Sequence, residues 1–191
     1  MKQPLVVERL FDAELYKALK DDLRSKVLSH GDSNIMPGRY LLEVDQSAIL
    51  QEAHTKALEI AKELFGIPDL LPSYALFAHY ETIGDIVPYL KKHKDNNACT
   101  YTIDMCLYQS EPWDIYVEGI PYTLHPNQAL AYYGEDQEHW RSEFPNPESG
   151  FVGMIFFFFV ESDHWFYTKG SDYVEVVNSI ITEEEWIASH K

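Results

Sequence analysis

The chain has 191 residues, and its 31 acidic and 15 basic residues give a formal net charge of −16 at pH 7. At this length a single domain over residues 1–191 is the expectation. Hydrophobic residues make up 46% of the sequence, too large a share for a disordered chain. The acidic excess argues against nucleic acid and against an anionic membrane surface as partners, because both are bound mainly through Lys and Arg.

Three further features of the sequence indicate a cytoplasmic protein. The first twenty residues lack the apolar segment and cleavage site of a secretory signal. The most apolar segment, residues 151–160, is too short to span a bilayer and predicts a buried strand instead. Cys99 and Cys106 lie on one predicted strand and should point to opposite faces, so we expect free thiols.

Residues 1–70 have a helical pattern and are predicted to support the rest of the domain. Asp12 can cap a helix that begins at residue 13 and carries one apolar stripe, formed by Leu15, Leu19, Leu23 and Val27. A short strand is predicted at 39–44. A second helix is expected from about Ser47 to a C-cap at Gly66.

Residues 71–170 have the pattern of short strands separated by turn residues. Strands are predicted at 74–81, 99–107, 113–117, 121–124, 128–133 and 151–160, with a further candidate at 164–168. In the tail, residues 171–191, Thr182 and Glu185 form a capping box for a final helix. The predicted fold is α+β and mainly β, with the N-terminal helices packed against an antiparallel sandwich or barrel.

The candidate metal ligands are His93, Asp95 and His139. In an extended segment residues i and i+2 face the same way, so His93 and Asp95 can point at one position, and His139 follows a later predicted strand. Two imidazoles and one carboxylate on one face of a metal leave other coordination positions open, as in non-heme Fe(II) oxygenases. The same ligands would also accept Zn(II), Ni(II) or Mn(II).

The His-x-Asp pattern alone has little specificity, because His30-Gly31-Asp32 repeats it in a predicted loop. The second copy differs by its context, with strands on both sides and a later histidine at a strand end. His125 and His164 are weaker alternatives for the third ligand.

The sequence from about residue 74 to residue 160 resembles the 2-oxoglutarate/Fe(II)-dependent dioxygenases, nearest to their prolyl-hydroxylase-like branch. The resemblance is carried by Tyr80, Gly84, His93-Lys94-Asp95, the Thr-rich strand, Pro112-Trp113 and His139-Trp140-Arg141. It implies a double-stranded β-helix, or jelly roll, flanked by the N-terminal helices. It also implies that the three ligands hold Fe(II), that 2-oxoglutarate is the cosubstrate, and that dioxygen hydroxylates a peptidyl (including prolyl) or small-molecule substrate.

The sequence departs from this family at one position. Members usually carry an Arg or Lys about ten residues after the second histidine, where it pairs the far carboxylate of 2-oxoglutarate. No basic residue occurs between residues 142 and 159 here. Arg141 is the nearest substitute, because at i+2 from His139 it faces the same side of a continuing strand. Hydroxyl donors could come from Tyr80, Tyr101 and Tyr132. Alternatively, Arg141 pairs with Glu138 or Glu143 at the surface.

Several alternatives stay open at this point. The basic residues Lys91, Lys92 and Lys94 would steer an anionic cosubstrate or merely balance nearby carboxylates. Tryptophans line a substrate mouth or pack in the core, and the latter is the commoner role for Trp113, Trp140 and Trp165. The chain could also be a non-catalytic jelly-roll module that binds a ligand or protein, or a cupin-like metalloenzyme that does not use 2-oxoglutarate.

Overall fold

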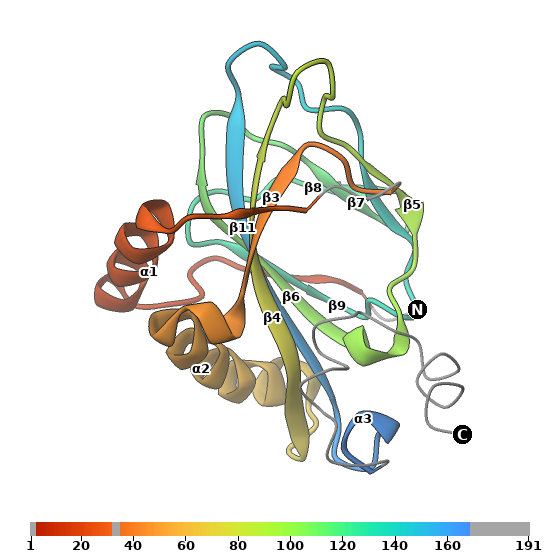
Figure 1. Cartoon of the computed structure of the whole chain (residues 1–191). Coiled ribbons are helices and arrows are strands. Elements are labelled where there is room, and N and C mark those ends of the chain that lie inside the picture. The colour runs from red at the N-terminus through yellow and green to blue at the C-terminus, as the bar shows by residue number, and fades with distance from the viewer. Residues whose placement is uncertain (1–2, 32–34, 169–191) are drawn as a thin grey trace, which may run out of the picture.

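A computed structural model describes residues 3–31 and 35–168, which form two facing antiparallel β-sheets with helices on one side (Figure 1). The larger sheet has seven strands in the order β1 (Leu5–Val7), β9 (Ala129–Tyr132), β6 (Tyr101–Gln109), β11 (Phe151–Glu161), β4 (Leu70–Glu81), β3 (Arg39–Glu43) and β2 (Ser29–His30). The smaller sheet has four, in the order β5 (Leu90–His93), β10 (His139–Arg141), β7 (Ile115–Val117) and β8 (Ile120–Tyr122). This arrangement confirms the mainly β fold predicted from the sequence.

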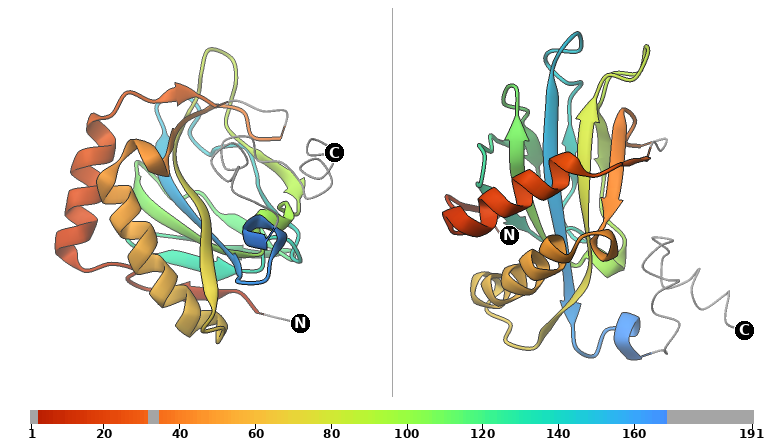
Figure 2. Two further views of the ribbon diagram at one scale, coloured as in Figure 1. Left: turned by 60° about the horizontal axis from the view of Figure 1, so that its bottom comes forward. Right: turned by 60° about the vertical axis from the view of Figure 1, so that its left-hand side comes forward.

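The helices α1 (Ala13–Ser25) and α2 (Ala48–Phe65) cover the outer face of the larger sheet (Figure 2). Both begin at their predicted N-caps, and α2 also ends at its predicted C-cap. Asp12 accepts a hydrogen bond from the Leu15 amide, Ser47 accepts one from the Leu50 amide, and Gly66 ends α2 in the left-handed conformation with φ 71°. The expected apolar stripe of the first helix includes one residue that lies outside the helix. α1 ends at Ser25, and Val27 is 94% exposed.

The core has two layers, one on each face of the larger sheet. Alternation along β11 supplies both, since neighbouring side chains point to opposite faces. Phe157 and Phe159 pack toward the helices, whereas Phe158 and Val160 pack between the two sheets. The layer between the sheets contains the cavity described below.

Several elements differ from the prediction. Residues 165–168 form a short helix, α3 (Trp165–Thr168), where a strand was a candidate. The strands β1, β2, β5 and β10 were not predicted; each has two to four residues, and β2, β5 and β10 are mostly polar in sequence. The 3₁₀ helices η1 (Val44–Gln46) and η2 (Asn97–Cys99) were also missed, so Cys99 precedes β6 rather than beginning it.

The structure also bears on the predictions for the two cysteines and for residues 1–70. Cys99 and Cys106 are both buried free thiols. The first 70 residues contribute three strands to the larger sheet in addition to the two helices. The predicted capping box at Thr182 and Glu185 lies outside the described residues. Within residues 3–31 and 35–168, no helix has the length and apolar character needed to cross a membrane.

Candidate metal centre

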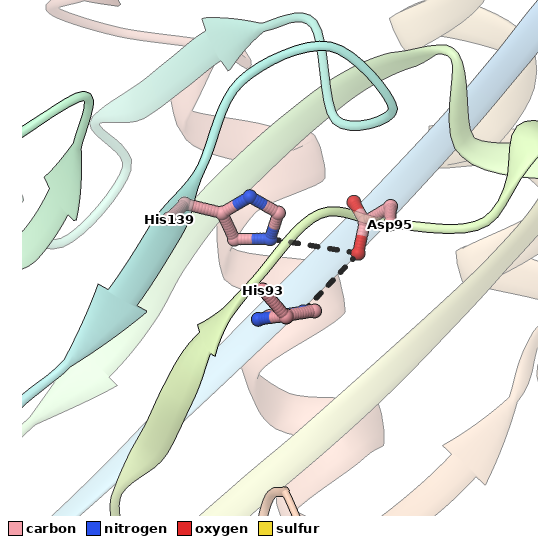
Figure 3. A group of neighbouring side chains, drawn as sticks. All are labelled: His93, Asp95 and His139. Atoms are coloured by element: carbon pink, nitrogen blue, oxygen red, sulfur yellow. Dashed lines mark ion pairs between the residues drawn. The ribbon is translucent and has the colours of Figure 1, made fainter.

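The three predicted metal ligands lie side by side between the two sheets (Figure 3). His93 is the last residue of β5 and pairs directly with His139, the first residue of the neighbouring strand β10. Asp95 follows two residues after His93, and its backbone N–H donates to the Gly134 carbonyl at 2.9 Å. Antiparallel pairing therefore places the two imidazoles together, and the backbone bond to Gly134 holds the carboxylate beside them.

The spacing of the ligand atoms fits one metal ion. Asp95 Oδ1 lies 3.4 Å from His93 Nε2 and 3.5 Å from His139 Nε2, and one ligand atom from each residue lies within 4.8 Å of the other two. An ion with bonds of about 2.1 Å holds neighbouring ligand atoms about 3–3.5 Å apart. Among the described residues this is the group of His, Cys, Asp and Glu side chains that meets such spacing.

Hydrogen bonds to the other ring nitrogens orient both imidazoles. His93 Nδ1 lies 2.8 Å from the Lys91 carbonyl oxygen, and His139 Nδ1 lies 3.0 Å from the Gln137 carbonyl oxygen. A carbonyl only accepts, so each Nδ1 carries the proton and donates. The lone pair of each Nε2 then faces Asp95, which is the tautomer that a metal requires.

The electrostatics of the group favour an ionised carboxylate. Burial alone would raise the pKa of Asp95, but His139 and His93, whose Nε2 atoms donate to the carboxylate when the imidazoles are protonated, outweigh it and lower that pKa to about 2. Burial likewise acts to lower the pKa of His139, yet Asp95 outweighs it, so the pKa of His139 is raised. The donor set of one ionised carboxylate and two imidazoles suits Fe(II), and also Zn(II), Ni(II) or Mn(II).

The alternative histidines lie elsewhere. His125 is exposed in the turn before β9, and His164 stacks beside Trp165 near α3. His30 ends β2 at the edge of the larger sheet, where its ring packs against Tyr40. Of the two His-x-Asp copies, only the second lies beside a further histidine at metal-ligand spacing among the described residues.

A cavity of about 260 Å³ opens beside the three ligands. Its wall mixes apolar side chains with polar and charged ones. They include Tyr74, Leu76, Tyr80, Asp104, Tyr132, Arg141, Phe156 and Phe158. The metal ligands and this pocket together form one site.

Three of the four residues predicted to hold the cosubstrate line this cavity. Tyr80, Tyr132 and Arg141 all do, and all three are buried. Tyr101 does not, because alternation along β6 turns Tyr101, Ile103 and Met105 toward the helices. The Tyr101 hydroxyl donates to Glu161 at the far end of β11, so the structure does not bring Tyr101 to the site.

Arg141 is buried and faces the cavity rather than the surface. Its side chain is only 5% exposed, which does not fit the alternative of a surface ion pair with Glu138 or Glu143. Its Nη1 donates to the Trp113 carbonyl, and its guanidinium lies 4.9 Å from the centre of the Trp113 ring. Trp113 thus fixes Arg141 on the same side of β10 as His139.

The sequence analysis missed two charged residues in the cavity wall. Asp104 of β6 is 1% exposed and accepts a 3.2 Å hydrogen bond from the Tyr132 hydroxyl. Burial raises the pKa of Asp104 to about 7, although Arg141 acts in the opposite direction. Arg39 of β3 is buried at the cavity and donates to the Gly31 carbonyl. A single carboxylate within the otherwise uncharged segment 99–107 was a usable signal for Asp104, whereas nothing local distinguished Arg39.

Of the basic and aromatic residues considered for the site, some line the cavity and others lie elsewhere. Of the three lysines, Lys94 lines the cavity, while Lys92 pairs with Glu138 at 2.8 Å on the outer face of the smaller sheet. Trp140 stacks on Tyr116 with the ring planes 7° apart, and Trp113 and Trp165 are buried in the core, so none of the three lines the cavity. Two residues of the phenylalanine run, Phe156 and Phe158, do line it, although that run was interpreted as core.

Comparison with known proteins identifies the fold. No family model and no curated protein matches the sequence. Among solved structures, the non-heme α-ketoglutarate-dependent epimerase SnoN from nogalamycin biosynthesis has a TM-score of 0.63 at 12% identity, over 81% of this chain and 78% of that one. A Pseudomonas putida prolyl-4-hydroxylase has a TM-score of 0.62 at 14% identity, over 81% and 91% of the two chains.

A third structure shows the same fold with ligands. HygX from Streptomyces hygroscopicus, solved with nickel and 2-oxoglutarate bound, has a TM-score of 0.56 at 10% identity, over 81% of this chain and 82% of that one. At such low identities the likeness establishes the fold. The predicted double-stranded β-helix with flanking N-terminal helices is therefore confirmed, and the chain has the fold of 2-oxoglutarate/Fe(II) oxygenases.

Proposed function

We propose that this chain is a non-heme Fe(II)- and 2-oxoglutarate-dependent dioxygenase that hydroxylates a small-molecule or peptidyl substrate. The observation that carries the proposal is the His93, Asp95 and His139 group, which has metal-ligand spacing and opens onto a cavity within a double-stranded β-helix. When bound, Fe(II) and 2-oxoglutarate would supply the activation of dioxygen needed to oxidise a C–H bond. A prolyl hydroxylase of this fold was solved with a peptide fragment and HygX with hygromycin B, which supports keeping both substrate classes in the proposal.

The protein's own contribution is to hold and orient these groups. The two imidazoles and the Asp95 carboxylate would occupy one face of the metal and leave the other face toward the cavity. The backbone carbonyls of Lys91 and Gln137 fix the imidazole tautomers, so both Nε2 atoms are ready to bind.

Arg141 is the proposed partner of the distal carboxylate of 2-oxoglutarate. It lies two residues from His139 on the same face of β10, a separation of about 7 Å along the strand. The Tyr80 and Tyr132 side chains complete this side of the cavity. An arginine suits the role because its planar guanidinium matches a carboxylate, and a buried carboxylate needs a charged or well-placed donor.

The apolar wall has a separate role. Leu76, Phe156 and Phe158 face the cavity from the larger sheet and would exclude water from the reacting groups. On the side toward solvent, the partly exposed Ile35, Leu90 and Lys94 form the entrance through which a substrate would reach the metal.

The test is anaerobic titration with Fe(II) and 2-oxoglutarate, followed by measurement of 2-oxoglutarate consumption in air. We expect a weak visible absorption band from the iron and 2-oxoglutarate complex, and slow consumption of 2-oxoglutarate even without substrate. His93→Ala should abolish both, because it removes one of three ligands. His30→Ala is the matched control from the other His-x-Asp copy and should leave both intact.

Other outcomes would favour the alternative functions. Iron binding that depends on His93 without any 2-oxoglutarate binding would indicate a metalloenzyme of another kind. Failure to bind iron would contradict the enzyme proposal and favour a non-catalytic binding module.

A further inference from the structure

Two buried polar atoms in the cavity wall have no hydrogen-bond partner among the described residues. They are Asp104 Oδ1 and Arg141 Nη2. Both side chains line the same cavity and both are more than nine-tenths buried. Leaving such buried groups without a hydrogen bond is unfavourable, and more so when they are charged. One atom accepts and the other donates, so a ligand that fits here must present a donor to Asp104 and an acceptor to Arg141.

Both of these residues are neighbours of the metal ligand His139. Arg141 follows His139 by two residues on β10, and the Tyr132 ring packs against the His139 ring with centroids 5.0 Å apart. The Tyr132 hydroxyl then donates to the other carboxylate oxygen of Asp104. Tyr132 therefore contacts both the metal ligand His139 and Asp104.

The surroundings of Asp104 contain few other charges. Arg141 and His139 face it from β10, Tyr132 from β9, and Asp95 from the segment after β5. Its direct neighbour on β11 is the apolar Phe156. Among these groups Arg141 is the permanent cation, so a second carboxylate placed beside Asp104 and Arg141 would leave one of the two negative charges without a cation next to it.

We propose that Asp104 and Arg141 together bind the distal group of the oxo acid, and that Asp104 restricts this group to one that carries a hydrogen-bond donor. This inference rests on the proposed 2-oxoglutarate dependence. A primary amide meets both requirements in its neutral form, with its oxygen toward Arg141 and its NH₂ toward Asp104. A carboxylate meets them only with one added proton, which it shares with Asp104 as paired carboxylates do.

The proton balance follows directly. When Asp104 is ionised in the free protein, binding of a distal carboxylate takes up one proton from solvent, and no other bond is made or broken. The pKa of about 7 for Asp104 supports a proton being available there near neutral pH. Binding of the carboxylate should therefore weaken as pH rises, by up to about tenfold per pH unit above that pKa.

The experiment compares two redox-inert probes, N-oxalylglycine and N-oxalylglycinamide, which differ only in a distal carboxylate or amide. Their dissociation constants are measured by calorimetry on the full chain loaded with Zn(II), at a series of pH values from ~6 to ~8. We expect wild type to bind the amide about tenfold more tightly than the carboxylate at the highest pH, since one unpaired buried group costs that much. The amide also serves as the control for pH effects on the metal ligands.

The matched variant is Asp104→Asn, which keeps the shape but offers an NH₂ donor. It should bind the carboxylate probe more tightly than the amide, and the pH dependence specific to the carboxylate should disappear. Proton uptake by wild type, measured in buffers of different ionisation enthalpy, tests the same point without any variant. Equal binding of the two probes at every pH value, with no proton uptake, would overturn the inference and leave the proposed function standing. No binding of either probe would contradict the proposed function itself.

Discussion

Asp95 is the ligand whose position depends most on a neighbouring backbone. Its N–H bonds to the Gly134 carbonyl, and its Oδ2 lies close above the Gly134 α-carbon. A β-carbon added at Gly134 would lie against Asp95 Oδ2 and 2.6 Å from both the Cys99 carbonyl oxygen and Thr102 Oγ1. Glycine is therefore required here by space, and its role is to let the carboxylate approach the two histidines.

We predict that Gly134→Ala lowers metal affinity by about 10- to 100-fold, as loss of a positioning contact around a metal ligand does. The added methyl group must displace the Asp95 carboxylate, since the other two close atoms belong to the backbone and to a buried strand. Affinity for Zn(II) or Fe(II) is measured by competition with a chromophoric chelator.

The control for this prediction is Gly84→Ala. Gly84 has a φ of 62°, so the substitution costs about 1–2 kcal/mol of backbone strain, but a β-carbon there meets nothing within 4 Å. It should reduce stability without changing metal affinity. Equal metal affinity in Gly134→Ala and wild type would show that Asp95 is not held in this way.

The residues of the site differ in how far the sequence could place them. His93 and Asp95 were found because i and i+2 share a face in extended chain, and Arg141 follows from His139 by the same rule. Tyr101 was misplaced because the sequence does not show which face of β6 meets the cavity, and neighbouring side chains of a strand point to opposite faces. Arg39 comes from a distant strand, and only the pairing of β3 with β4 brings it to the cavity.

At the scale of whole elements, α2 and β11 are joined by a buried histidine. His54 of α2 is 7% exposed, its Nε2 lies 3.3 Å from the Phe158 carbonyl oxygen, and its ring packs against Phe157 and Phe159. The pairing of β11 with β4 is irregular between Phe157 and Phe159, so the Phe158 carbonyl takes a donor from the helix at this point. Burial lowers the pKa of His54 to about 4.

This depressed pKa predicts an acid-sensitive contact. The unfolded chain protonates His54 near its ordinary pKa of about 6.5, whereas the folded chain resists protonation until about pH 4. The unfolded state therefore binds more protons between these values, and the free energy of unfolding falls by about 3 kcal/mol as pH drops through this window.

His54→Leu removes the titrating group and should reduce this loss. At neutral pH we expect the variant to be less stable by about 1–3 kcal/mol, because the Phe158 carbonyl loses its donor. Urea unfolding of both proteins at pH ~7 and ~4.5 gives the four free energies that are compared. The same acid-induced loss in variant and wild type would assign the pH sensitivity to other groups.

Strands with an apolar sequence were predictable, and the pairing of strands into two sheets was less so. β4, β6, β9 and β11 could be identified from their apolar composition, whereas β5 and β10, which carry the metal ligands, are short and mostly polar. Their pairing is set by the tertiary structure, and only the resemblance to a known fold indicated it. The α3 error has the same origin, because a few aromatic residues fit a strand or a helix turn equally well.

At the scale of the whole molecule, charge is distributed unevenly. The net charge is −16, and yet two of the four arginines, Arg39 and Arg141, are buried at the cavity. Burying an arginine away from water is unfavourable unless it meets acceptors. An anionic ligand at the cavity would offset this cost, which accords with the proposed oxo acid.

The metal site should also couple to the stability of the entire fold. The ligands come from β10 and from the end of β5 and the segment after it, elements that are brought together only when the smaller sheet forms. A metal that binds the folded chain alone stabilises it by about 2.7 kcal/mol when its free concentration is a hundred times its dissociation constant. We therefore predict that Zn(II) raises the midpoint of chemical unfolding, and that His93→Ala removes this increase.

The pH dependence of that stabilisation has a definite sign. In the metal-free protein the raised pKa of His139 favours its protonated form, so this contribution to stability is full below the ordinary histidine pKa of about 6.5 and is lost as pH rises through the folded value. Metal binding requires the neutral imidazole, so protons compete with the metal from a higher pH than they would at an ordinary histidine. The stability difference between metal-loaded and metal-free protein should accordingly increase from pH ~6 to ~8, across the ordinary histidine range. Unfolding with and without Zn(II) at both values measures it, and a difference that is constant or that shrinks with rising pH would show that His139 is not a ligand.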